Sequence, residues 1–159
     1  MTVEQFNPYN ERVITVVGGK GPLGSKVTAG LEPLGFQSIQ ICEKGDPFLD
    51  FVNRSTDLFF AVDNTEITAM LQASRDYLKP HHTVLDGSSV KEPLITTYRE
   101  LDNLQISVVS THLGSVPAQP WRGIKVWVCE VGPNSERAKR LAFDLFLSTN
   151  SSIRTIDIA

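Results

Sequence analysis

The chain has 159 residues, of which 41% are hydrophobic and 21% charged, and its formal net charge is −3. This length is typical of a single domain that buries a core without disulfide or metal support, and the composition excludes a disordered protein. The acidic excess is unsuited to a phosphate backbone, so we expect no nucleic-acid partner. No apolar run approaches the ~18 residues of a transmembrane helix, so we expect no membrane segment.

Short apolar runs alternate with helical periodicities along the chain. The β-branched runs predict strands at 12–17, 38–42, 57–62, 83–85, 106–109 and 124–131, with an edge strand at 153–158. Apolar residues spaced by three or four predict helices at 23–34, 67–78, 90–101 and 138–146. This alternation predicts a single doubly wound α/β domain over residues 1–159, with a mostly parallel sheet and helices on both faces.

The cysteines and the N-terminus bear on the compartment. Cys42 and Cys129 are too few for a disulfide framework or a zinc site, so we expect a reducing compartment and no metal. The first ten residues are polar, unlike a signal peptide. We therefore expect a cytoplasmic protein.

A glycine motif follows the first predicted strand. The run Gly19-Lys20-Gly21-Pro22-Leu23-Gly24 fits G-x-G-x-x-G and stands between a strand and a helix, as a Rossmann-type dinucleotide site requires. We expect Gly19 to permit the tight turn, Gly21 to let the backbone approach a pyrophosphate, and Gly24 to let helix and strand pack closely. The phosphates would lie at the helix N-terminus.

An acidic residue stands where such a site binds the adenosine ribose. Glu43 ends the second predicted strand, 19 residues after Gly24, and favours NAD because it opposes a 2′-phosphate. Lys44 next to it keeps NADP open as the less favoured cofactor. The residues that we predict to bind the cofactor are Gly19, Lys20, Gly21, Pro22, Leu23, Gly24, Glu43, Val62, Asp63 and Ser88.

Two further residues, Ser89 and His112, are candidate catalytic residues. Ser89 lies after the fourth predicted strand, where ligands bind in open α/β sheets, and it also begins a capping box with Glu92. His112 ends the fifth predicted strand and begins the irregular loop 112–123, which is rich in Gly, Pro and Ser. His81 and His82 are adjacent and point to opposite faces of an extended chain, so we expect them to be structural.

These residues resemble the nucleotide-binding domain of prephenate and arogenate dehydrogenases. The resemblance rests on the glycine motif, Glu43, the segment 86–91 with its Ser-Val-Lys, and His112 followed by Gly114 and Pro117. It implies an NAD-dependent oxidative decarboxylation of a cyclohexadienyl acid in tyrosine-type biosynthesis. His112 would take the proton from the ring hydroxyl, and Ser89 would hydrogen-bond near it.

The chain also departs from that family. Leu113 follows the histidine where the family has proline, and Asp63 replaces another proline. The family's helical domain supplies an arginine for the substrate carboxylates and has no counterpart before Ala159, so Arg122 is the candidate substrate-binding residue. We therefore expect a homo-oligomer, such as a dimer, or a partner chain, with Phe143, Phe146 and the last strand as the docking surface. The alternative is a non-catalytic NAD(P)-binding module that acts as a sensor or as a subunit of a larger assembly.

Overall fold

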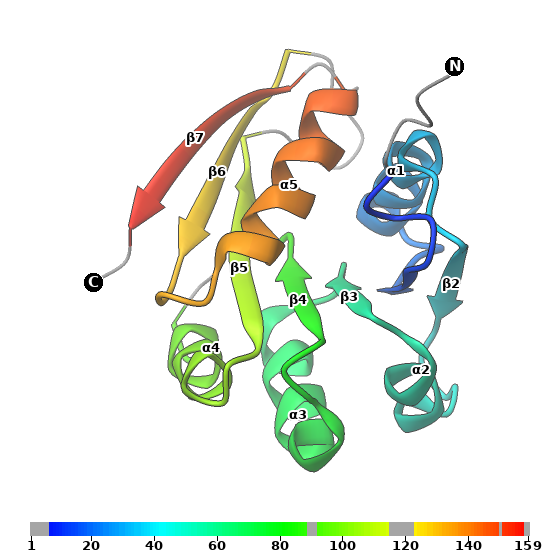
Figure 1. Ribbon diagram of the computed structural model, residues 1–159, viewed down its shortest axis with the longest axis vertical. Helices are drawn as coiled ribbons and strands as arrows, with labels where there is room; N and C mark the ends of the chain where they lie inside the picture. The colour runs from blue at the N-terminus through cyan, green and yellow to red at the C-terminus, as the bar shows by residue number, and fades with distance from the viewer. Residues whose placement is uncertain (1–6, 89–91, 115–122, 150, 158–159) are drawn as a thin grey trace, which may run out of the picture.

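The computed structural model describes residues 7–88, 92–114, 123–149 and 151–157. Their strands form one seven-stranded sheet in the order β2-β1-β3-β4-β5-β6-β7 (Figure 1). The first five strands are parallel, β6 is antiparallel to β5, and β7 is parallel to β6. The strands are β1 (Val13–Val17), β2 (Ser38–Cys42), β3 (Asp57–Phe60), β4 (Thr83–Asp86), β5 (Ser107–Leu113), β6 (Lys125–Glu130) and β7 (Ser152–Asp157).

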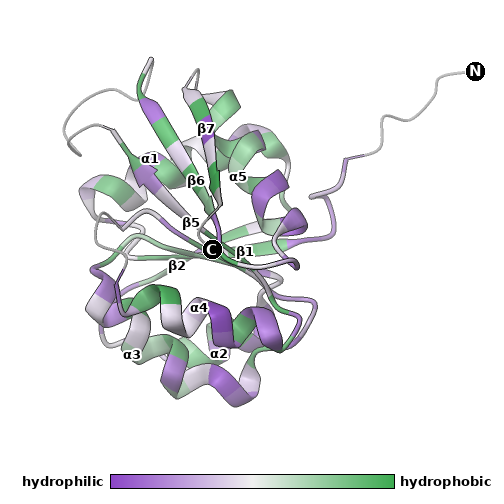
Figure 2. Cartoon of the chain, turned by 90° about the vertical axis from the view of Figure 1, so that its left-hand side faces the viewer, coloured by the Kyte–Doolittle hydropathy of each residue, from purple (hydrophilic) through white to green (hydrophobic). Residues whose placement is uncertain are grey.

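Helices cover both faces of the sheet. One layer holds α1 and α5, and the other holds α2, α3 and α4 (Figure 2). The helices are α1 (Pro22–Leu31), α2 (Phe48–Arg54), α3 (Asn64–Ser74), α4 (Leu94–Asn103) and α5 (Glu136–Ser148), and the 3-10 turns are η1 (Glu32–Leu34) and η2 (Arg75–Tyr77). The predicted doubly wound, mostly parallel Rossmann-type fold is confirmed.

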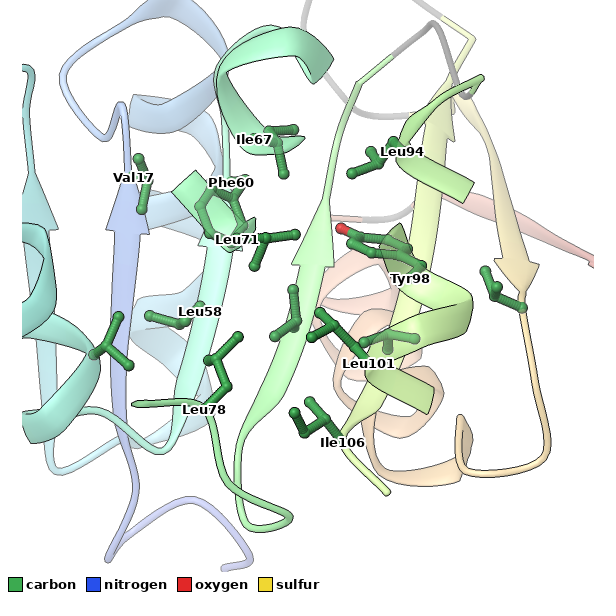
Figure 3. Close-up of a cluster of buried hydrophobic side chains, with 14 of the residues drawn as sticks. Val17, Leu58, Phe60, Ile67, Leu71, Leu78, Leu94, Tyr98, Leu101 and Ile106 are labelled. Atoms are coloured by element: carbon green, nitrogen blue, oxygen red, sulfur yellow. The ribbon is translucent and has the colours of Figure 1, made fainter. Parts of the chain in front are cut away.

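The strands divide their side chains between two cores. In β3, Phe59 packs with the α1 and α5 layer, whereas Leu58 and Phe60 pack with the layer of α2, α3 and α4. Tyr98 of α4 is fully buried in that second core (Figure 3). The alternation follows from the two-residue period of a strand, and burial on both faces explains the continuous apolar runs in the sequence.

The structure corrects several predicted element bounds. The seven-residue helix α2 was not predicted, because two turns are too short for a clear helical period. The helix predicted from residue 90 begins at Leu94 with Pro93 as its N-cap, so the predicted capping box from Ser89 to Glu92 does not start this helix. His112 lies within β5 rather than at the start of a loop, because β5 continues to pair with β6 as far as Leu113.

The predicted docking surface on the last helix is also corrected. Phe146 is fully buried, and Phe143 is partly buried against the same core, so these rings stabilise the fold. β7 is the outermost strand, as predicted. None of the helices in the described ranges has the length and apolarity that a membrane span requires.

Candidate functional site

The turn between β1 and α1 depends on glycines at specific points. Gly18 has a φ of +78°, and a Cβ there would lie 2.7 Å from Cγ1 of Val62. The left-handed position is therefore Gly18 rather than Gly19, where the sequence interpretation had placed the tight turn. A Cβ on Gly24 would overlap the carbonyl oxygen of Gly18, so helix and strand meet as closely as predicted.

Gly21 differs from these glycines because the space beside it is open. The nearest atom to a Cβ built on it is the Gly18 carbonyl oxygen at 3.4 Å, which is an ordinary contact. Gly21 is also the N-cap of α1, and no side chain caps this helix end. Pro22 occupies the first helical turn, and Leu23 packs against Gly87 after β4. The backbone here is accessible, and its N–H groups and the helix dipole favour an anion.

Glu43 is held against this turn. Its Oε1 atom accepts a hydrogen bond of 2.7 Å from the backbone N–H of Lys20, and its own N–H donates to Oδ2 of Asp46 at 2.8 Å. No side chain or backbone group of the described residues bonds Oε2. The carboxylate therefore keeps one oxygen available at the edge of the turn.

A cavity of about 350 Å³ opens beside Glu43, between the ends of β1 and β2 and the helix α3. Sequence reasoning found Glu43 and Val62 in its lining but missed Asp46, Phe48, Glu66 and Met70, because the missed residues lie on α2, α3 and the loop before α2. The further lining residues are Val17, Gly18, Cys42, Lys44, Gly45 and Ala69. Apolar walls with a few polar groups are typical of a small-molecule site.

Acidic side chains lie near Cys42 in the lining of the cavity. Burial, followed by the charges of Asp46 and Glu43, raises the pKa of the Cys42 thiol to about 11. The thiol is therefore protonated at neutral pH and acts as an apolar wall. Three acids and one lysine line the cavity. Their net negative charge disfavours the binding there of an additional phosphate, such as the 2′-phosphate of a dinucleotide.

The turn and the cavity lie at a topological switch point. β1 pairs with β2 on one side and with β3 on the other, so the connections after β1 and after β3 diverge. Ligands of open α/β sheets bind outside the carboxyl ends of strands at such a point. Asp63, at this same edge, is exposed and is the N-cap of α3.

The buried carboxylate of Asp86 lies at the end of β4, and the sequence analysis did not predict a role for it. Oδ1 of Asp86 accepts hydrogen bonds from Tyr98 Oη at 2.9 Å and from Ser110 Oγ at 2.6 Å. Oδ2 accepts the backbone N–H of Ser88 at 2.7 Å. Burial and the neighbouring Asp86 raise the pKa of Tyr98 well above its ordinary value. This network ties β4, β5 and α4 together, and its only sequence signal was an acid at a strand end.

His112 lies two residues beyond Ser110 on the same face of β5. Its register partner is Trp127 of β6, and the two ring centroids are 5.6 Å apart. Because β5 is parallel to β4 and β1, His112 lies at the edge of the sheet that also carries the glycine turn. Ser89 and Arg122, the other two predicted catalytic and substrate-binding residues, lie outside the described residues.

His81 and His82 lie at the opposite edge of the sheet. Nδ1 of His82 accepts the Lys79 N–H at 2.8 Å, and Nε2 donates to the Val52 carbonyl at 3.0 Å. Burial lowers the pKa of His82. His81 is exposed. Within the described residues, no group of three or more His, Cys, Asp or Glu side chains is arranged to hold a metal ion.

The comparisons with known proteins give similarity at the level of structure. Neither a scan against protein-family models nor a search of curated sequences finds a match. The chain is similar in structure to prephenate dehydrogenase from A. aeolicus in complex with hydroxyphenyl propionate and NAD+, with a TM-score of 0.73, 14% identity, and 94% of this chain aligned to 61% of that one.

Two other oxidoreductases have the same fold. An imine reductase from Bacillus cereus BAG3X2 aligns with a TM-score of 0.70 at 12% identity, over 91% of this chain and 54% of that chain. The 3-hydroxyisobutyrate dehydrogenase of Mycobacterium tuberculosis aligns with a TM-score of 0.72 at 12% identity, over 94% and 55%. The chain thus spans little more than half the length of these proteins. It has the Rossmann-type fold found in their matched parts.

Proposed function

We propose that this chain binds a nicotinamide dinucleotide and prefers NAD to NADP. The observation that carries the proposal is the open backbone at Gly21, at an uncapped helix N-terminus beside a cavity edged by Glu43. Solved structures of the same fold contain NAD+ in two proteins and NADPH in another. The residues present here fit such a group.

Different predicted residues would bind different parts of the cofactor. The turn 18–24 would hold the pyrophosphate through backbone N–H groups, and Glu43 would accept a hydrogen bond from a ribose hydroxyl. The apolar wall that includes Val62 and Met70 suits an adenine ring. Asp63 and Ser88 follow β3 and β4 along the same edge, toward His112. The bound cofactor would supply a hydride acceptor.

We further propose that the chain is the cofactor-binding part of a dehydrogenase of the prephenate and arogenate type. His112 is the proposed base, because a neutral imidazole accepts a proton near pH 7. In this proposal a ring nitrogen of His112 takes the proton of the substrate hydroxyl, and Ser89 orients the ring. Arg122 remains the proposed contact for a substrate carboxylate. A second copy or a partner chain would then shield the reaction from water.

The alternative is a dinucleotide-binding module without catalysis. It needs only the glycine turn, Glu43 and the cavity beside it, and it gives no role to His112, whose ring lies against Trp127.

Titration and turnover separate the two functions. We expect NADH to bind more tightly than NADPH and NAD+ to be reduced in the presence of prephenate or arogenate, followed by absorbance. His112→Asn should lower turnover by ~10²–10⁴-fold, as loss of a general base does, and leave NADH affinity unchanged, with His81→Asn as the control. NADH binding without turnover on either acid would support the module instead, and absence of binding would overturn both.

A further inference from the structure

We propose that His112, Trp127 and Arg154 form a binding row for a carboxylic acid that carries a ring, with Arg154 binding the carboxylate. The inference deepens the proposed function and rests on it for the reaction that the acid would undergo. It adds a carboxylate contact on β7 to the one proposed above for Arg122.

The register of three strands aligns these residues. His112 of β5 pairs with Trp127 of β6, and Trp127 pairs with Arg154 of β7. Neighbouring strands are ~4.8 Å apart, so the row spans ~10 Å between its outer backbones. One small molecule can bridge this span.

The three residues share one face of the sheet. Trp127 alternates with Val126 and Val128, which pack in the core beneath α5, so Trp127 faces the opposite side. Ile153 also packs against that core, which places its neighbour Arg154 on the side of Trp127. The ring contact between His112 and Trp127 agrees with this assignment.

The described helix that packs on β6 and β7 is α5, which lies on the other side of the sheet from Trp127. β6 and β7 lie at the outer flank of the sheet, and α4 packs beside β5 (Figure 1). Arg154 is exposed, Trp127 is half-buried, and Ile156 next to them is 42% exposed. An aromatic ring and an aliphatic side chain thus lie beside the cation of Arg154 on this face.

On β6 and β7, the charged side chains of this face are the cations Lys125 and Arg154. Arg154 forms no ion pair with any acid of the described residues. The same-face neighbours of Trp127 and Arg154 along β6 and β7 are Lys125, Cys129, Ser152 and Ile156, and none of them is acidic. An unpaired guanidinium binds a carboxylate through two parallel hydrogen bonds, and an indole offers a flat apolar surface to a ring.

The row also has a direction relative to the proposed cofactor site. His112 stands at its inner end, on the edge of the sheet that carries the glycine turn, and Arg154 stands at its outer end. An acid bound with its carboxylate at Arg154 would therefore present its ring over Trp127 and its far end to His112.

The test is a binding measurement on the full chain with 3-phenylpropionate, using the neutral 3-phenylpropanamide for comparison. We expect the acid to shift the indole N–H resonance of Trp127 in NMR spectra, assigned with Trp127→Phe, and to bind at least about ten-fold more tightly than the amide. Arg154→Gln should weaken the acid about ten-fold and leave the amide unchanged, and Arg154→Lys should recover part of the loss because it keeps the charge.

Arg140→Gln is the matched control, because Arg140 is an exposed arginine on α5, at the other face. Equal binding of acid and amide, or equal affinity in Arg154→Gln and Arg140→Gln, would overturn the inference. Titration with NADH separates it from the proposed function. If the chain binds NADH but shows no preference for the acid over the amide, the binding row is overturned and the proposed function stands. If it binds the acid through Arg154 but does not bind NADH, the row stands and the proposed function is overturned.

Discussion

The carboxylate of Glu43 accepts a hydrogen bond of 2.7 Å from the backbone N–H of Lys20, which joins the end of β2 to the glycine-rich turn. The acid that would select the ribose and the turn that would hold the pyrophosphate are therefore one connected unit. A change at either residue should therefore reach the other.

Substitutions at Gly21 and Gly24 should affect different properties, cofactor binding in the first case and stability of the fold in the second. Gly21→Val adds a side chain in open space, so we expect loss of NADH binding with a change in unfolding free energy below ~1 kcal/mol. Gly24→Ala forces a Cβ into the Gly18 carbonyl and should destabilise the fold by ~1–3 kcal/mol, as overpacking does. NADH fluorescence and urea unfolding measure the two effects. Unchanged NADH affinity in Gly21→Val would exclude the turn as the phosphate site.

Glu43→Gln should change cofactor selectivity. The amide still accepts the Lys20 N–H but removes the negative charge, so we expect NADH to bind more weakly and NADPH more strongly than in the wild type. The pKa of Cys42 should fall from about 11, because the Glu43 charge contributes to raising it. Glu32→Gln, an exposed acid in η1, is the control. Parallel losses for both cofactors would assign the selectivity to another residue.

Asp86→Asn should destabilise the protein. The Asp86 carboxylate accepts hydrogen bonds from Ser88, Tyr98 and Ser110 inside the fold. The NH2 group of an asparagine would either face the Ser88 N–H or require the two hydroxyls to turn from donors into acceptors. We expect a loss of ~2–4 kcal/mol in unfolding free energy, because bonds to charged groups and unsatisfied buried donors each cost ~1–3 kcal/mol. Asp50→Asn, on the exposed side of α2, should stay within ~0.5 kcal/mol of the wild type. A similar small effect for Asp86→Asn in urea unfolding would show that the network does not stabilise the fold.

His82 should make stability depend on acid pH. Burial lowers its pKa from the ordinary value of 6.5, so the unfolded chain binds the proton first as the pH falls. The contribution of His82 is therefore fully present above about pH 6.5 and is lost as the pH falls through the folded-state pKa. Urea unfolding between pH 8 and pH 5 should show this loss in the wild type and in His81→Gln.

His82→Gln should be less stable at pH 7, because it loses the bonds to Lys79 and Val52, and should show a shallower loss toward pH 5. His81 is exposed, but its ring centroid lies 4.0 Å from that of His82 and its charge helps to lower the His82 pKa, so His81→Gln should lose slightly less stability than the wild type toward pH 5. An equal pH slope in both variants would mean that other groups cause the acid sensitivity.

The local pattern of the sequence was sufficient for the order of the elements and for the glycine turn. Apolar runs stopped by Gly or Pro mark strands buried on both faces, and these signals lie within a few residues of one another. The same holds for the spacing from Gly19 to Gly24. The local pattern did not predict α2, because a helix of seven residues has too few turns to show a period, and it did not predict the start of α4 at Leu94.

The tertiary structure decided what these segments bring together. Gly18, rather than Gly19, has the left-handed backbone, and Val62 from the loop after β3 occupies the space that a Cβ on Gly18 would need. Asp86 meets Ser110, and Trp127 stands between His112 and Arg154, because strand register joins residues far apart in the chain. Local periodicity encodes backbone conformation and the buried face of each element. Register depends on the sum of many distant contacts, so it emerges only when the whole sheet is packed.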